Sequence, residues 1–156
     1  FAPTPITILR EPVLFFNPNN PNAKHIEAVQ TKEDFYSLKG ANFLGNSTHA
    51  ETWKDHPNII EVNNVELIIK MLLRGRIDFY FADPIVTGYI IKQMGLAGHL
   101  AYISMAHIIN KGNLTQMRFG LRRSYPSAQN VINEIDMAIK KTITPELHNK
   151  VVRQYI

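Results

Sequence analysis

Cysteine is absent from the 156-residue sequence, and this absence excludes disulfides, thiol catalysis and cysteine-based metal sites. Long apolar runs are also absent, so no segment has the length needed to span a bilayer as a helix. The six histidines lack the paired spacing typical of metal ligands, and the sequence therefore predicts neither a metal site nor a cofactor. Four carboxylates show no pairing suited to acid–base catalysis, and we expect most of them to be solvated: Glu51, Asp55, Glu61 and Asp78.

A strong charge of either sign is lacking as well. The formal charge is +4, and the Lys and Arg residues are scattered, with short pairs only at Arg122-Arg123 and Lys140-Lys141. This distribution is typical of a solvated surface and predicts no nucleic-acid partner, whereas an anionic or zwitterionic small ligand is compatible with it. What the chain does have is 45% hydrophobic residues, enough for one ordinary domain with a real core.

Strand-like and helix-like segments alternate along the chain. The apolar segments of strand length are residues 13–16, 41–44, 59–62, 77–81, 100–103 and 117–121. Segments with helical spacing or helix-start signals are residues 31–38, 48–54, 64–73, 84–94, 124–139 and 144–152. This order predicts an α/β fold, with an open, mostly parallel sheet and helices on both faces.

One stretch, residues 74–89, places a carboxylate where ligands commonly bind. Gly75 can end the preceding helix in the left-handed conformation, and a buried strand follows from Ile77 to Phe81. Asp83 then has the position of an N-cap, with Pro84 at the first helical position. A polar residue between a strand and the next helix lies at the carboxyl edge of the sheet, the edge used by ligands in open α/β folds.

A second stretch predicts an anion site. Gly45-Asn-Ser-Thr48 is a small polar loop after a short strand, and Thr48-His-Ala-Glu51 has the form of a capping box that opens a helix. The first backbone N–H groups of a helix are free and attract negative charge. The stretch lacks the glycine spacing of a dinucleotide-binding or P-loop motif.

Five phrases in order resemble the second lobe of periplasmic solute-binding proteins of the polar amino-acid type, the receptors of ABC importers. These phrases are Ser37-Leu-Lys-Gly40, Asn46-Ser-Thr-His-Ala-Glu-Thr-Trp53, Leu72-Leu-Arg-Gly-Arg-Ile-Asp78, Ala82-Asp-Pro-Ile-Val-Thr-Gly-Tyr89 and Arg118-Phe-Gly-Leu121. They are similar to the family's "DLKG", "GTTAEDW", "LLxGRVDA" and "ADxxxxxY" phrases and to its returning strand. The similarity extends over nearly the whole chain.

The resemblance implies a fragment. The opening Phe1-Ala-Pro-Thr-Pro5 is similar to a family phrase near the end of the first lobe, and it lacks the basic start and apolar core of a signal peptide. We therefore expect residues 1–16 to be the end of lobe one and a hinge strand. Residues 17–121 would then form the α/β domain of lobe two, and residues 122–156 the C-terminal helices. The rest of lobe one, with its share of the ligand contacts, is expected to be missing.

The resemblance also implies a function: binding of an amino acid or similar small polar solute between two hinged lobes, for import through a membrane permease. By position, the ligand-binding residues would be Ser47, Thr48, His49 and Asp83. The protein itself is expected to be periplasmic or extracytoplasmic. A carboxylate suits a ligand's ammonium group, and a helix start suits its carboxylate.

Other interpretations remain open at this stage. Asp83 and Thr48 could do no more than cap their helices. The same fold also serves as the sensing domain of membrane receptors or histidine kinases, and a few relatives are dehydratases or parts of lytic transglycosylases. The resemblance favours a binding protein over an enzyme.

Overall fold

A computed structural model describes residues 1–8, 13–45, 55–105, 108 and 116–155 of the chain. Contacts divide the chain into two compact units. One, here called the sheet unit, is Glu11–Lys111; the other, the terminal unit, combines Phe1–Arg10 with Gly112–Ile156. These limits differ from the predicted lobe boundaries at residues 16 and 121. The assignment of residues 1–16 to the end of a first lobe stays a prediction.

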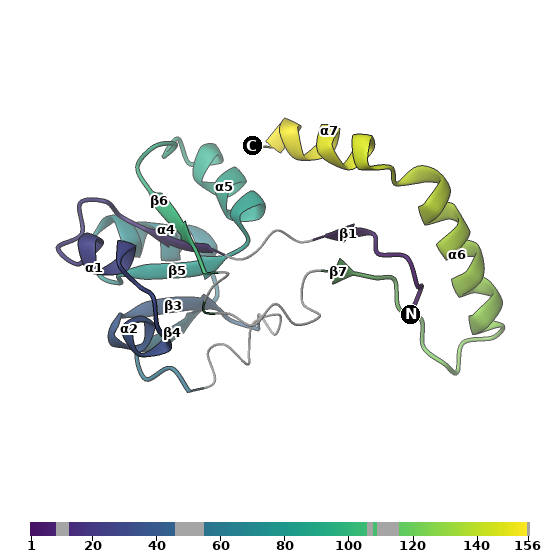
Figure 1. Ribbon diagram of the computed structural model, residues 1–156, viewed down its shortest axis with the longest axis horizontal. Coiled ribbons are helices and arrows are strands. Elements are labelled where there is room, and N and C mark those ends of the chain that lie inside the picture. The colour runs from purple at the N-terminus through teal and green to yellow at the C-terminus, as the bar shows by residue number, and fades with distance from the viewer. Residues whose placement is uncertain (9–12, 46–54, 106–107, 109–115, 156) are drawn as a thin grey trace. The chain divides into compact units, whose positions relative to one another are not determined.

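The sheet unit is built on five strands in the order β4-β3-β5-β2-β6 (Figure 1). They are β2 (Val13–Phe16), β3 (Gly40–Phe43), β4 (Ile59–Val62), β5 (Phe79–Ala82) and β6 (Ala101–Ser104). Strand β3 is parallel to β4 and β5, whereas β2 is antiparallel to both β5 and β6. Four strands therefore point the same way and β2 opposes them, which confirms the predicted open, mostly parallel sheet.

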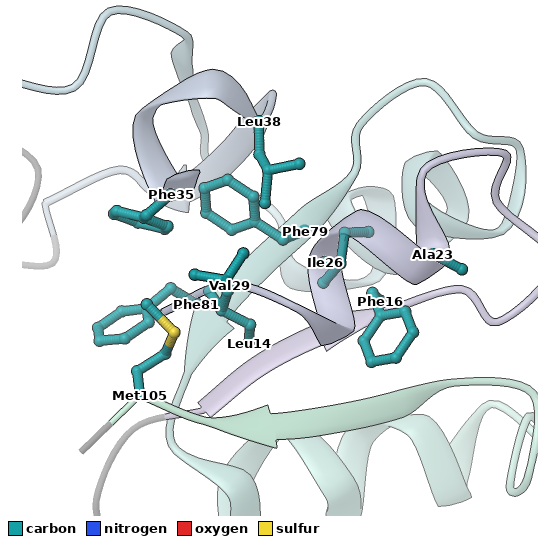
Figure 2. Packing of buried hydrophobic residues seen from close by; sticks show 10 residues of the cluster. All are labelled: Leu14, Phe16, Ala23, Ile26, Val29, Phe35, Leu38, Phe79, Phe81 and Met105. Atoms are coloured by element: carbon teal, nitrogen blue, oxygen red, sulfur yellow. The ribbon is translucent and has the colours of Figure 1, made fainter. Parts of the chain in front are cut away.

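The two central strands supply a core on each face of the sheet, because successive side chains of a strand point to opposite faces. Figure 2 shows one of these cores: Leu14 and Phe16 of β2 lie with Phe79 and Phe81 of β5. Helices α1 (Ala23–Glu27) and α2 (Lys32–Ser37) cover this face. The alternate residues Phe15 and Tyr80 face the other core, which α4 (Val65–Leu73) and α5 (Pro84–Gln93) cover. Helices on both faces are thus confirmed.

The helix-start signals of the sheet unit appear as caps. Thr31 and Asp34 form the capping box of α2, with Asp34 N donating to Thr31 Oγ1 over 3.1 Å and Thr31 N donating to Asp34 Oδ2 over 2.9 Å. Asn64, rather than Asn63, caps α4 through a 2.9 Å bond from Leu67 N to its side-chain oxygen. Gly75 and Gly95 follow α4 and α5 with φ of 63° and 71°, the left-handed conformation expected at helix ends.

Helix α1 was not anticipated from the sequence, which places only a turn-rich loop at residues 17–22. Two residues of this loop, Asn17 and Asn20, are buried, and the other four are exposed. Asn17 Nδ2 donates to Leu73 O at the end of α4 over 3.2 Å, and Asn20 and Asn22 both donate to Asp78 Oδ1. These bonds fix the chain between β2 and α1 to the amino edge of the sheet.

The terminal unit contains the two-stranded ribbon β1 (Thr7–Ile8) and β7 (Gln116–Met117) with helices α6 (Ala128–Thr142) and α7 (Pro145–Tyr155). Among its described residues, Ala2, Ile132 and Ile139 form an apolar core, and Asp136 is buried as well. Strand β7 is shorter than the predicted strand at residues 117–121. The predicted start of α6 at Ser124 is wrong, because Tyr125 precedes a proline and Ser127 adopts φ of 54°, which delay the helix to Ala128.

Candidate ligand-binding edge of the sheet

Asp83 stands between β5 and α5, as the sequence predicts. Its Oδ1 accepts hydrogen bonds from Ile85 N and Val86 N, at 2.8 and 2.9 Å, so the side chain caps α5. Pro84 occupies the first turn, where its missing N–H leaves no bond unmade. The Oδ2 atom has no hydrogen-bond partner among the residues that the structure describes, and the residue is only partly buried. One oxygen therefore holds the helix, and the other is available to a ligand.

The position of Asp83 is fixed by buried contacts below it. Tyr80 of β5 hydrogen-bonds through its side chain to Thr87, which lies one turn into α5 and is only 2% exposed. Burial raises the pKa of Tyr80 above its ordinary value. The Tyr80 and Thr87 side chains join the end of β5 to the first turn of α5, on either side of Asp83.

The loops after β3 and β5 begin side by side, because these strands pair directly and in parallel. Leu44 N donates to Val62 O over 2.9 Å, and Gly45 turns the chain with φ of 80°. Ser47, Thr48 and His49 lie outside the described residues, so their proximity to Asp83 stays a prediction. Of the four candidate ligand-binding residues, the structure places Asp83 alone.

The described part of this edge is acidic and partly apolar. In residues 44–45, 63–67, 83–86 and 105, the ionisable side chains are Glu66 and Asp83. Leu44, Leu67 and Val86 are exposed by 52%, 47% and 60%. The edge therefore suits a molecule or protein surface that brings a cationic group and some apolar area.

Ser104, which no signal in the sequence singles out, ends β6 at the same edge. Val13 of β2 pairs with Ala82 on one side and with Ser104 on the other, so Ser104 lies two strands from the start of the Asp83 turn. A short strand followed by a single serine carries no recognisable signal, and only the sheet order reveals this position.

Two other polar residues have structural roles. Asp78, expected to be solvated, accepts bonds from Asn20 and Asn22 at Oδ1 and from Lys39 N at Oδ2. His56 lies in the core facing α2, where its Nε2 donates to Phe35 O and its Nδ1 accepts from Asn58 N. Neither side chain lies at the carboxyl edge, so neither belongs to the candidate site.

Comparisons with known proteins find resemblance in structure alone. The chain matches no protein-family model and no curated protein sequence. Within the described residues, every helix is too short or too polar to cross a bilayer.

Solved structures resemble nearly the whole chain, and they are substrate-binding proteins of amino-acid ABC transporters. An ancestral arginine-binding protein bound to arginine matches with a TM-score of 0.65 at 14% identity, over 97% of this chain and 62% of its own. The ancestral amino-acid-binding protein AncCDT-1, a precursor of cyclohexadienyl dehydratase, matches with 0.64 at 14%, over 97% and 59%. A Streptococcus pneumoniae substrate-binding protein bound to L-arginine matches with 0.62 at 13%, over 98% and 57%.

The chain therefore has the fold of these substrate-binding proteins, which confirms the fold resemblance detected in the sequence. It spans about three fifths of the length of the structures that it matches.

Proposed function

We propose that the chain is part of an extracytoplasmic substrate-binding protein that captures an amino acid or similar small polar solute for an ABC-type permease. The observation that carries the proposal is the position of Asp83. In a fold shared with amino-acid-binding proteins, its Oδ2, which has no partner among the described residues, lies at the carboxyl edge of the sheet, where open α/β folds bind ligands. We assign the ligand's ammonium group to Asp83. We assign the ligand's carboxylate to the helix start that the sequence predicts at Ser47, Thr48 and His49.

The proposal includes a second lobe that this chain does not contain. About two fifths of each solved structure has no counterpart in this chain, and the acidic edge with its exposed leucines and valine would form one wall of a cleft. A ligand enclosed by two lobes gains contacts from both walls. The 156-residue chain should accordingly bind solutes much more weakly than the complete protein.

The complete protein provides the direct test, beginning with a thermal-shift screen of amino acids, polyamines and small organic acids. Asp83→Asn keeps a good N-cap and removes the charge, so it should weaken binding of an ammonium-bearing ligand at least tenfold in calorimetry. The melting temperature of the unliganded variant should stay close to that of the parent.

Asp83→Ala is the matched comparison, because it removes both the charge and the cap. It should lose affinity to a similar extent and, in addition, about 1 kcal/mol of stability. Unchanged affinity in Asp83→Asn would show that Asp83 does no more than cap α5, and would remove it from the site.

One comparison favours a second candidate, an enzyme, because a matching binding protein is a precursor of a dehydratase. A binding protein returns its ligand unchanged. Any ligand found in the screen should therefore be recovered intact after long incubation with the protein, as followed by NMR. Steady conversion that Asp83→Asn abolishes would support the enzyme instead.

A further inference from the structure

The charge of the chain is divided unequally between its two units. The sheet unit has nine Lys and Arg against ten Asp and Glu, a formal charge of −1. The terminal unit, about half that size, has eight against three, a formal charge of +5. The basic residues are scattered along the sequence, but their excess over acidic residues falls in the terminal unit.

Within the terminal unit, the loop of residues 118–127 combines positive charge with exposed aromatic rings. Every residue of this loop except Leu121 is exposed, including Arg122 and Arg123. Phe119 and Tyr125 expose 47% and 53% of their surface. We call these four residues, Phe119, Arg122, Arg123 and Tyr125, the basic aromatic loop.

Backbone bonds give this loop a defined shape where it joins β7 to α6 (Figure 1). Ala2 N donates to Phe119 O over 2.8 Å, so the start of the loop is held to the first residues of the chain. Tyr125 N donates to Arg122 O over 2.9 Å and Ala128 N to Tyr125 O over 3.0 Å, which makes two successive turns. A turn brings its first and last residues together, so Arg122 and Tyr125 lie beside each other.

Among the residues that the structure describes, Arg122 and Arg123 form no ion pair. Residues 84–133 contain no Asp or Glu at all. The closest buried acid of the unit, Asp136, is already engaged by Lys140 Nζ at 2.8 Å and by Thr4 N at 2.6 Å. Lys141, Lys150 and Arg153 are also exposed, and none has an ion-pair partner among the described residues. The positive charge is therefore directed at solvent.

We propose that the basic aromatic loop docks the protein on an anionic lipid surface. Basic side chains are attracted to acidic headgroups, and aromatic rings settle at the boundary between headgroups and acyl chains. A nucleic-acid site usually needs a longer track of phosphate contacts than a single pair of neighbouring arginines supplies. This inference concerns the terminal unit and is independent of the ligand proposed for Asp83.

Sedimentation with lipid vesicles tests the proposal on the 156-residue chain. The chain should partition onto vesicles of phosphatidylglycerol and phosphatidylcholine at low salt, and much less onto phosphatidylcholine alone. Each basic residue near the surface contributes about fivefold to the partition coefficient, so Arg122→Gln with Arg123→Gln should reduce it about 25-fold. Salt at several hundred millimolar should have a similar effect.

The matched control is Arg74→Gln with Arg76→Gln, which removes two exposed arginines from the sheet unit. This control should change the partition coefficient less than threefold. Phe119→Ser with Tyr125→Ser, which keeps all charges, should weaken vesicle binding several-fold.

Three results would overturn the assignment. One is equal loss in both arginine pairs, which would make binding a matter of net charge. Another is equal partition onto neutral vesicles. The third is retention on heparin or DNA without any sedimentation with anionic vesicles, which would point to a soluble polyanion.

Discussion

His56 forms a hydrogen bond at each ring nitrogen, one to helix α2 and one to the segment just before β4. Its ring packs against Phe35, Tyr36 and Phe79 with centroid distances of 4.7, 4.9 and 5.7 Å. Since Nδ1 accepts a hydrogen bond from Asn58 N, a second proton on the ring would break that bond. Burial lowers the pKa of His56 below its ordinary value of 6.5.

The lowered pKa makes stability depend on pH in a definite direction. Above about pH 6.5 the ring is neutral in both folded and unfolded chains, and its contribution is complete. As the pH falls below this value, the unfolded chain binds a proton that the folded chain resists, so the free energy of unfolding decreases. Urea titrations at pH 7.5, 6.5 and 5.5 should show this decline, and His56→Gln should reduce its slope. His99→Gln, at an exposed turn, serves as the control; an identical slope in His56→Gln would exclude His56 as the cause.

At the scale of single elements, Gly40 shows how a strand depends on its neighbour. The sequence suggests that Gly40 ends a helix, but α2 already ends at Ser37 and Gly40 begins β3. The Phe79 ring of the adjacent strand fills the space where a side chain at this position would project. The glycine is therefore required by packing rather than by a helix end.

Gly40→Ala should consequently destabilise the protein by about 1–3 kcal/mol, because the added methyl group forces the buried Phe79 ring to move. Thermal or urea unfolding measures this loss. Phe79→Leu removes part of the ring, so the double variant should be more stable than the sum of the two single losses predicts. Strict additivity would show that the two residues do not interfere.

The elements differ in how well the sequence predicts them. Residues 64–73 and 83–94 carry an apolar stripe or a cap with a proline, and α4 and α5 begin where these signals place them. Helix α1 has five residues and no side-chain cap. Its formation therefore depends on the hydrogen bonds that hold the preceding loop, residues 17–22, rather than on local signals. Asp83 could be placed because strand, cap and proline follow one another directly between Ile77 and Pro84. The hydrogen-bond partners of Asp78 could not be predicted, because Asn20, Asn22 and Lys39 lie far from it in the sequence.

At the scale of the whole molecule, the two units have very different cores. Each face of the five-stranded sheet buries ten residues, whereas the core of the terminal unit contains Ala2, Ile132 and Ile139. Two-stranded ribbons are marginal without further packing. Polar contacts therefore carry more of the terminal unit's stability, and Asp136 is the most connected of them.

Asp136→Asn should loosen the terminal unit and leave the sheet unit unaffected. The Lys140 side chain and then the Thr4 N–H lower the pKa of Asp136 to about 2, so these contacts stabilise the fold above about pH 4 and are lost as the pH falls toward 2. Hydrogen exchange at neutral pH should become faster in residues 1–6 and 128–142 of the variant and remain unchanged in β2 and β5. Parent and variant should become alike near pH 2. Uniformly faster exchange throughout the chain would contradict the independence of the two units.

The place of β2 in the sheet has a consequence for synthesis on the ribosome. This strand is synthesised well before its two neighbours, β5 and β6, which end at Ala82 and Ser104. Until both neighbours have been synthesised, the four apolar side chains of β2 have no partner strands to pack beside. Strand pairing between segments far apart in the sequence also forms slowly. The sheet unit therefore stays unfolded until synthesis has passed Ser104, a state suited to chaperone binding.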